Sequence, residues 1–480
     1  MPDTPYIPPA DSRQDTAPHL QSLLQEQRDA HQTDPMPSLD VRRDRLDRLY
    51  RLLEQNTDSF IRAISEDFGN RSAHETRLAE IMVMLAEIRH TQKRLAGWMR
   101  PRRIGTTWPF WPARNRLVRQ PLGVVGVISP WNYPLQLALS PALGALAAGN
   151  RVMLKPSEFT PRFSQALQQA VTRYFATSEM AVVTGDAEVG KAFSQLPFDH
   201  LLFTGSTAVG RLVAQAAAPN LTPVTLELGG KSPALIDLSA DLAVTAMRIA
   251  TGKLLNAGQT CVAPDYVLVH RSQFDAFTDA YGQAVRTLYP QIPDNPDYTS
   301  IIHQKHFGRL VNLMEEAHAQ GAEVVALGET QASTRRLAPC MVLNPPADCK
   351  LMQEEIFGPI LPVLPYDHID QALQRINQGP HPLALYWFGN DANVQEKVLT
   401  TTLSGGVTIN DCVYHVAQVN QPFGGVGASG MGAYHGEWGF RTFSKEKPVF
   451  IQSPLAGSRM LRPPYGKQFE QLMGLLMKWG

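Results

Sequence analysis

The sequence has little of what marks secreted, membrane-spanning or nucleic-acid-binding proteins. It holds only four cysteines in 480 residues and no C-x-x-C pair, so neither a disulfide framework nor a zinc site is expected. Lysine plus arginine and aspartate plus glutamate both number 44, which leaves no basic excess for a nucleic-acid partner. No apolar run reaches the roughly 18 residues of a transmembrane helix, and the polar N-terminus lacks the apolar segment of a signal peptide. These absences predict a cytoplasmic protein without a metal site.

The chain is long enough for two or three domains, and its N-terminal part is expected to be helical. Residues 1–18 are polar and proline-rich, which predicts a flexible arm. Within residues 19–99, apolar side chains recur at helical spacing, for example at Leu46, Leu49 and Leu53. Residues 100–120 are rich in proline, tryptophan and arginine and predict a connecting arm or an exposed hairpin.

From Pro121 onward, short β-branched runs alternate with helical stretches. Alternation of this kind is typical of parallel sheets with helices on both faces, so the predicted fold class is α/β. The pattern stops and restarts near residue 232, which predicts a second α/β domain. The glycine-rich stretch 422–436 is predicted to be a loop. The expected strands are 123–129, 150–156, 179–185, 199–205, 223–229, 232–238 and 266–270, and the expected helices are 135–148, 161–176, 207–218, 241–256 and 273–287.

Three residues could carry covalent chemistry. Cys261, in NAGQTCVAP, follows a predicted helix, and its thiolate would be a strong nucleophile; the alternative is a buried structural cysteine. Glu227, in LELGGKSP, ends a predicted strand at the sheet edge where parallel α/β folds place ligands; it could be a general base or a solvated strand-end carboxylate. Asn132, in SPWNYPL, could donate to an oxyanion or simply occupy a turn.

Other motifs point to phosphate or ribose binding. Lys155, in LKPSE, could bind a ribose hydroxyl or a phosphate, or form a surface charge pair. In FTGSTAVG, Gly205 and Gly210 allow close backbone approach at a predicted helix N-terminus, which attracts a pyrophosphate. The spacing is neither that of a P-loop nor that of G-x-G-x-x-G. The Glu and Phe of EEIFGP are unremarkable taken alone.

These motifs occur together in one chain, in their order along the sequence and at these separations, and that combination resembles the aldehyde dehydrogenase superfamily. The resemblance covers about residues 40–450. The short N-terminus is similar to that of the class 3 branch. Within that branch the stretches GQTCVAPDY, SEFTP, NDCVYHVAQ and GMGAYHG are most similar to bacterial coniferyl-aldehyde dehydrogenases.

The resemblance implies a role for each motif residue. Cys261 would be the nucleophile, Glu227 the base for deacylation, and Asn132, with the Cys261 backbone N–H, the oxyanion hole. The implied cofactor is NAD+, with NADP+ as an alternative, because Glu158 beside the adenosine ribose would repel a 2′-phosphate. The implied cofactor contacts are Trp131, Lys155, Glu158, Gly205, Ser206, Gly210, Glu355 and Phe357.

The resemblance also implies a domain plan and an assembly. A flexible arm (1–18) would precede a Rossmann-like NAD(P)-binding domain (19–105 and 121–228) and an α/β catalytic domain (229–429). A small β arm for oligomerisation (106–120 with part of 430–480) would form a homodimer. The apolar stripe in FEQLMGLLMKW (469–479) would dock on the partner subunit, the alternative being peripheral contact with a membrane surface.

The implied reaction is oxidation of an aldehyde to a carboxylic acid through a thiohemiacetal and a thioester on Cys261. Two alternatives stay open: transfer of the thioester to CoA, against which Glu227 argues, and a catalytically silent structural relative, against which Cys261 and Glu227 both argue. The substrate would be an aromatic or a medium- to long-chain aliphatic aldehyde. It would reach Cys261 through an apolar tunnel lined by Tyr133, Leu137, Tyr414 and Val416.

Overall fold

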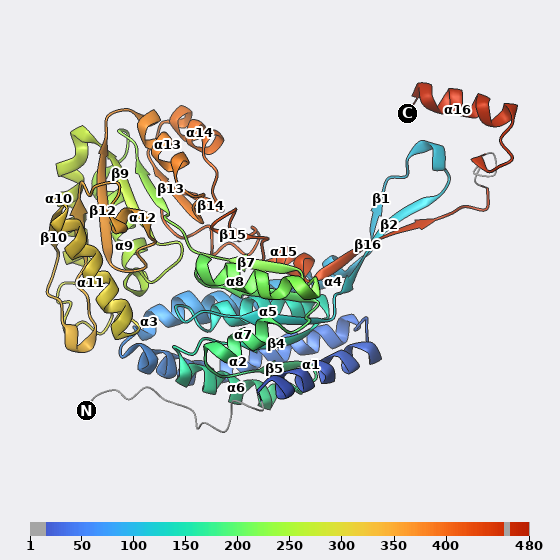
Figure 1. The fold of residues 1–480 in the computed structure, drawn as a ribbon, viewed down its shortest axis with the longest axis horizontal. Coiled ribbons are helices and arrows are strands. Elements are labelled where there is room, and N and C mark those ends of the chain that lie inside the picture. The colour runs from blue at the N-terminus through green and yellow to red at the C-terminus, as the bar shows by residue number, and fades with distance from the viewer. Residues whose placement is uncertain (1–15, 456–460, 480) are drawn as a thin grey trace.

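The computed structural model describes residues 16–455 and 461–479, which form two α/β bodies and a projecting β arm (Figure 1). Both bodies contain a largely parallel sheet, as the alternation of strands and helices predicted. The predicted flexible arm lies outside the described residues up to residue 15. Helix α1 already begins at Thr16, so the last residues of that predicted arm are helical.

The first body is a six-stranded sheet with the strand order β15-β7-β6-β3-β4-β5. All its strand pairs are parallel except β15 with β7. Its strands are β3 (Val124–Ile128), β4 (Arg151–Lys155), β5 (Met180–Val182), β6 (His200–Thr204), β7 (Val224–Glu227) and β15 (Gly430–Met431). Its helices are α1 (Thr16–Thr33), α2 (Leu39–Phe68), α3 (Ala73–Thr76), α4 (Val83–Met99), α5 (Gln136–Ala148), α6 (Pro161–Tyr174), α7 (Ala187–Ser194), α8 (Thr207–Ala217) and α15 (Gly436–Thr442), with a π-helical turn at Arg77–Met82.

Alternate side chains of the central strands enter two different cores, which shows that helices cover both faces of this sheet. Val125 and Val127 pack with residues of α2, α4, α5 and α6. Val124 and Leu201 pack with residues of α1, α7 and α8 on the opposite face. This is the doubly wound arrangement, and it leaves the carboxyl ends of the strands as the natural ligand edge.

The second body is a seven-stranded sheet with the order β10-β11-β12-β9-β8-β13-β14, antiparallel only between β10 and β11. Its strands are β8 (Pro233–Ile236), β9 (Tyr266–His270), β10 (Glu323–Ala326), β11 (Cys340–Leu343), β12 (Ile360–Tyr366), β13 (Ala384–Phe388) and β14 (Gly406–Ile409). Its helices are α9 (Leu242–Leu254), α10 (Phe274–Leu288), α11 (Gln304–Ala319), α12 (Lys350–Gln353), α13 (Ile369–Gln378) and α14 (Ala392–Thr401).

The arm is a three-stranded antiparallel sheet of β1 (Arg102–Ile104), β2 (Arg114–Pro121) and β16 (Ser444–Ile451). It extends away from both bodies, and α16 (Lys467–Trp479) lies near its far end (Figure 1). The hairpin predicted within residues 100–120 is therefore present, and a C-terminal strand completes its sheet. None of the helices in the described part of the chain is long and apolar enough to cross a membrane.

One prediction needs correction in this region. The glycine-rich stretch 422–436 is not entirely loop, because Gly430 and Met431 form β15 and pair with Glu227 and Leu226 of β7. Gly430 has a φ of +158°, and a Cβ there would collide with the Leu226 carbonyl oxygen. The glycine therefore permits the close approach that joins this stretch to the first sheet.

Candidate active site

The candidate nucleophile lies on a rigid turn between α9 and β9. Asn256 and Ala257 adopt φ values of +54° and +50°, and Gly258 has a φ of +75° with its Cα against the Gly358 carbonyl. The Gln259 side chain holds the turn by donating to Asn256 O at 3.0 Å and to Ser300 O at 3.1 Å. Three consecutive left-handed residues reverse the chain and place Cys261 at the junction of the two bodies.

Asn132 lies against this turn, directly after β3. Its side-chain Nδ2 donates to Gln259 O at 3.1 Å, and its buried backbone carbonyl accepts from Asn256 Nδ2 at 2.9 Å. Because an amide nitrogen carries two hydrogens, one N–H of Asn132 remains for another acceptor. The structure therefore brings the predicted oxyanion donor to the predicted nucleophile's turn.

Cys261 and two carboxyl groups share one low-dielectric environment. Burial first, and then the charges of Glu355 and Glu227, raise the pKa of the Cys261 thiol to about 12. The backbone amides of Cys261 and Val262 act in the opposite direction on this thiol pKa. Burial also raises the pKa of Glu227 well above its usual range, because a low-dielectric environment disfavours the charged carboxylate.

Glu227 ends β7, as predicted, and its carboxyl group is buried without a hydrogen-bond partner among the described residues. Its backbone is fixed on both sides, because its carbonyl accepts from Gly205 N at 3.0 Å and it pairs with Gly430. The strand is thus held in place while the side chain is free to accept a proton or bind water. Perturbed, unpartnered carboxyls of this kind are typical of general bases.

Tyr434 is a residue of this site that the sequence did not point to. Its hydroxyl is buried without a hydrogen-bond partner among the described residues. Burial raises its pKa well above the usual range, and the charges of Glu227, Glu87 and Cys261 raise it further. Tyr434 therefore lies within electrostatic range of both predicted reactive groups. The only available signal was its position within the glycine-rich stretch 422–436.

The structure brings the predicted residues Trp131 and Phe357 together. Their rings meet edge to face at 5.4 Å, and the Phe357 carbonyl lies 2.8 Å from Nε2 of His306. Phe357 has a φ of +55°, which is rare for an aromatic residue and places it on the turn of EEIFGP that contacts the Cys261 turn. The adjacent Glu355 carboxyl has a pKa raised to about 8, first by burial and then by Asp265.

The other predicted cofactor contacts lie along the carboxyl ends of β4 and β6. Lys155 is buried, and its Nζ donates to Pro156 O at 3.0 Å and lies 3.5 Å from the partly exposed Glu158 carboxylate. Ser206 caps the N-terminus of α8 by accepting from Val209 N. Gly210 faces Leu228, and a Cβ there would collide with that side chain. The helix N-terminus therefore lies close to β7 and to Glu227.

The four predicted tunnel residues fall in different environments. Tyr133 is buried, and its hydroxyl lies 2.8 Å from Thr260 Oγ1, one residue before the nucleophile. Leu137 is buried in α5. Val416 is half-buried and packs on the same apolar cluster as Cys261, whereas Tyr414 is exposed.

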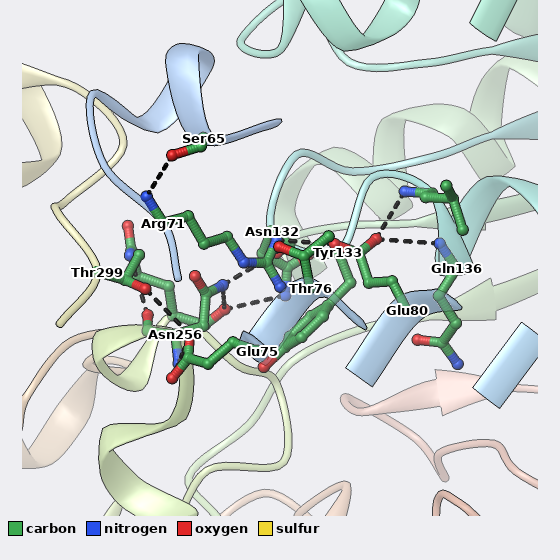
Figure 2. Close-up of polar contacts among 12 residues, drawn as sticks. Ser65, Arg71, Glu75, Thr76, Glu80, Asn132, Tyr133, Gln136, Asn256 and Thr299 are labelled. Carbon is green, nitrogen blue, oxygen red and sulfur yellow. Dashed lines mark hydrogen bonds and ion pairs between the residues drawn. The ribbon is translucent and has the colours of Figure 1, made fainter. Parts of the chain in front are cut away.

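A buried polar network beneath Asn132 was also missed (Figure 2). Arg71 and Glu80 form an ion pair with no solvent exposure, and the Glu75 carboxylate accepts from the Asn256 backbone and from Thr299 Oγ1. A signal was available, because Glu80 shares a helical face with the buried Met84 and Glu87. A charged residue on a core-facing stripe indicates a buried partner.

Comparison with known proteins is consistent with this geometry: the chain belongs to the aldehyde dehydrogenase family, whose model matches residues 10–449. It is therefore an oxidoreductase that acts on aldehydes. The chain is 52% identical to a Pseudomonas aeruginosa protein named "Probable coniferyl aldehyde dehydrogenase", over 95% of both chains. It superposes on the substrate-bound state of Staphylococcus aureus AldH with a TM-score of 0.91 and 37% identity, over 95% of this chain and 99% of that one. A Mycobacterium tuberculosis aldehyde dehydrogenase complexed with NAD+ is 27% identical, with a TM-score of 0.82 over 92% and 91% of the two chains.

Proposed function

We propose that this enzyme oxidises aromatic aldehydes to carboxylic acids with NAD+, through a thioester on Cys261 that water hydrolyses. The observation that carries the proposal is the unpartnered, buried Glu227 carboxyl within electrostatic range of Cys261. A buried carboxyl with a raised pKa is a stronger base, once ionised, than a solvated one. The name of the Pseudomonas aeruginosa relative supports an aromatic substrate.

In the first half of the reaction, the Cys261 thiol gives its proton to solvent water, and the thiolate sulfur attacks the aldehyde carbon. The oxyanion that forms accepts hydrogen bonds from the free N–H of Asn132 and from the backbone amide of Cys261. One such donor contributes about 3 kcal/mol to transition-state stabilisation. NAD+, when bound, would accept the hydride that leaves the thiohemiacetal carbon, and Cys261 Sγ would then carry the acyl group as a thioester.

In the second half, ionised Glu227 takes a proton from water, and the hydroxide formed attacks the thioester carbonyl. The C–S bond then breaks, the acid leaves, and the proton held by Glu227 passes to the Cys261 thiolate, which restores both groups. The Asn132 side chain again donates a hydrogen bond to the oxyanion. Glu227 suits this step because both of its oxygens are free of partners in the described structure.

The chain's own residues fit a nicotinamide dinucleotide. Three side chains at the carboxyl ends of β3, β6 and β7, namely Ser129, Thr204 and Glu227, have buried polar atoms without partners in the described residues. The N-terminus of α8 would hold a pyrophosphate, with Gly205, Ser206 and Gly210 at the turn. Lys155 and Glu158 would bind the adenosine ribose, and Glu355, Phe357 and Trp131 would hold the nicotinamide end.

Replacement of Glu227 tests the hydrolytic step. We expect Glu227→Gln to release one NADH per active site in a burst and then to stall, with steady turnover lowered about 10²- to 10⁴-fold. Intact-mass spectrometry should detect the acyl group on Cys261. Adding millimolar CoA should restore no turnover. Rapid steady turnover of the variant, or acyl-CoA formation by the wild type, would contradict the assignment.

Replacement of Glu158 tests the cofactor preference. The Glu158 carboxylate would repel a 2′-phosphate, so Glu158→Gln should raise the ratio of kcat/KM for NADP+ over NAD+ by about tenfold, equivalent to roughly 1.4 kcal/mol. Initial rates with a panel of aromatic and aliphatic aldehydes, measured with each cofactor, give this ratio and rank the substrates. An unchanged ratio would remove Glu158 from the 2′ position.

We further propose a homodimer that forms through the arm, in the cytoplasm. Trp111 and Phe450 on the arm are 69% and 49% exposed, which favours burial against a partner. The apolar stripe of α16 would likewise be buried against the partner subunit. All four cysteines are free, which favours a reducing compartment. Sedimentation of the purified protein would measure the assembly.

A further inference from the structure

The most completely buried charges near the candidate site belong to Arg71 and Glu80, which do not contact Cys261. Arg71 Nη1 lies 2.9 Å from Glu80 Oε1, and neither side chain has any solvent exposure. The guanidinium also lies over the Tyr133 ring at 4.8 Å and the Phe68 ring at 5.3 Å. Figure 2 shows Arg71 directed toward Asn132, with Glu80 on the side of Gln136.

This ion pair holds both ends of the turn that carries Asn132. Arg71 Nη1 donates to the Asn132 carbonyl at 3.0 Å. Glu80 Oε2 accepts from the backbone amides of Leu135 at 2.8 Å and Gln136 at 3.1 Å, at the start of α5. Residues 132–136 are therefore held by one arginine and one carboxylate that are themselves paired.

The same turn is joined to the nucleophile's turn through Asn256. Asn256 Nδ2 donates both to the Asn132 carbonyl at 2.9 Å and to Gln259 O at 3.2 Å. The Asn132 carbonyl thus accepts from Arg71 on one side and from Asn256 on the other. Its side-chain amide then meets Gln259 O at 3.1 Å. Backbone and side chain of Asn132 are both fixed relative to Cys261.

Stability alone does not account for this arrangement. Burying an ion pair costs more than packing apolar side chains of similar volume, unless its remaining polar atoms are satisfied. Arg71 Nε and Nη2 have no hydrogen-bond partner among the described residues. The pair is therefore poorly optimised for stability, although both of its members are directed at the Asn132 turn.

We propose that the Arg71–Glu80 pair is a positioning device that holds the Asn132 amide at the place where the oxyanion develops. The inference rests on the proposed role of Asn132 in the reaction. A donor displaced by about 1 Å loses most of its effect on the transition state, so a fixed turn matters more than the presence of the amide alone.

The double variant Arg71→Met/Glu80→Gln removes both charges and leaves no unpaired one. We expect its NADH burst with saturating NAD+ and aldehyde to be slower by about 10- to 100-fold. The matched control is Arg45→Met/Glu179→Gln, another pair with a buried arginine (3.2 Å), located away from the predicted site residues. The control should lose thermal stability but keep the wild-type burst rate.

A double-mutant cycle separates positioning from general damage. In an Asn132→Ala background the pair has no donor to position, so its removal should slow the burst by less than about twofold. If the double variant does not fold, Arg71→Lys carries the same expectation, because lysine keeps the charge but lacks the fixed planar fork.

Three results would overturn the inference. The first is a burst no slower than that of the control pair, and the second is an equal slowing in the Asn132→Ala background. Both leave the role of Asn132 intact, because Asn132→Ala alone would still be slow. The third is a wild-type burst rate in Asn132→Ala alone, which would overturn the proposed oxyanion role and the inference with it.

Discussion

The two edges of the first sheet differ in whether their buried polar side chains have hydrogen-bond partners. At the amino edge, Glu179 precedes β5 and pairs with Arg45 at 3.2 Å and Arg48 at 2.7 Å. Asn150 precedes β4, and its side chain accepts from Leu122 and Gly123 amides and donates to two carbonyls. At the carboxyl edge, by contrast, the polar side chains that follow or end β3, β6 and β7 are buried without partners in the described residues.

This difference is consistent with a structural role for the amino edge and with the chemical role proposed for the carboxyl edge. Burial opposes ionisation of Glu179, but hydrogen bonds and charge from Arg48 and Arg45 lower its pKa to about 2. Glu227 has no such partner, and burial alone raises its pKa well above the usual range. Unpartnered polar groups cost stability, so their concentration at the edge where parallel sheets bind ligands indicates a functional site.

The largest expected effect at the carboxyl edge comes from Cys261. Cys261→Ala should lower aldehyde oxidation by about 10³-fold or more while cofactor binding survives, because only the nucleophile is lost. Steady-state rates and NAD+ titration by fluorescence measure the two properties. The Ala variants of Cys340, Cys349 and Cys412 are the controls and should remain active. Retention of more than about 5% of the rate would remove Cys261 from its role.

Replacing the glutamate at each edge by glutamine should change the free energy of unfolding by a smaller amount, and in opposite directions at the two edges. At pH 7, Glu227→Gln should stabilise the protein by about 0.5–2 kcal/mol, because the neutral amide avoids the cost of a buried carboxyl. Glu179→Gln should destabilise it by about 1–3 kcal/mol, because two arginines lose their anionic partner. Thermal unfolding of both variants beside the wild type measures the difference.

The pH trends of these two effects should also be opposite. The folded pKa of Glu227 is raised, so the wild type loses stability as pH rises above the unfolded value of about 4.3, and the Gln variant does not. The extra stability of Glu227→Gln over the wild type should therefore vanish near pH 4. The folded pKa of Glu179 is lowered, so its contribution is present above the unfolded value and is lost as pH falls toward 2. If the stabilities of both variants relative to the wild type changed with pH in the same direction, the proposed difference between the two edges would be wrong.

The sequence predicted strands β3–β9 and the helices α5, α6 and α8–α10 because their periodicity is local, but it gave no expectation for β10–β14 or α11–α14 of the second sheet. Expected strands such as 266–270 and helices such as 161–176 correspond to β9 and α6. It could not predict β15 inside the glycine-rich stretch, since that pairing depends on a partner about 200 residues earlier in the chain. Helix α7 was also missed, because it is short and has only a few apolar positions.

For the candidate site, the motif residues were recognisable because each lies in a short, distinctive segment. The structure places Asn132 and the turn that carries Cys261 in hydrogen-bond contact, and Trp131 against Phe357. The helical face of Glu80 indicated that this residue is buried, but the contacts of Arg71 and Glu80 could not be assigned, because they reach a turn about 60 residues away. Long-range polar contacts leave no periodicity in the sequence.

The path of the chain has a consequence for synthesis on the ribosome. The second body interrupts the first in the chain, and the first sheet is completed only when β15 joins β7. The arm is completed later still, when β16 joins β2. The second sheet, by contrast, is drawn entirely from residues 233–409. The domain that emerges second can therefore close before the one that emerges first. During translation the first sheet keeps an open edge until Gly430–Met431 is made, and the arm keeps one until Ser444–Ile451 is made.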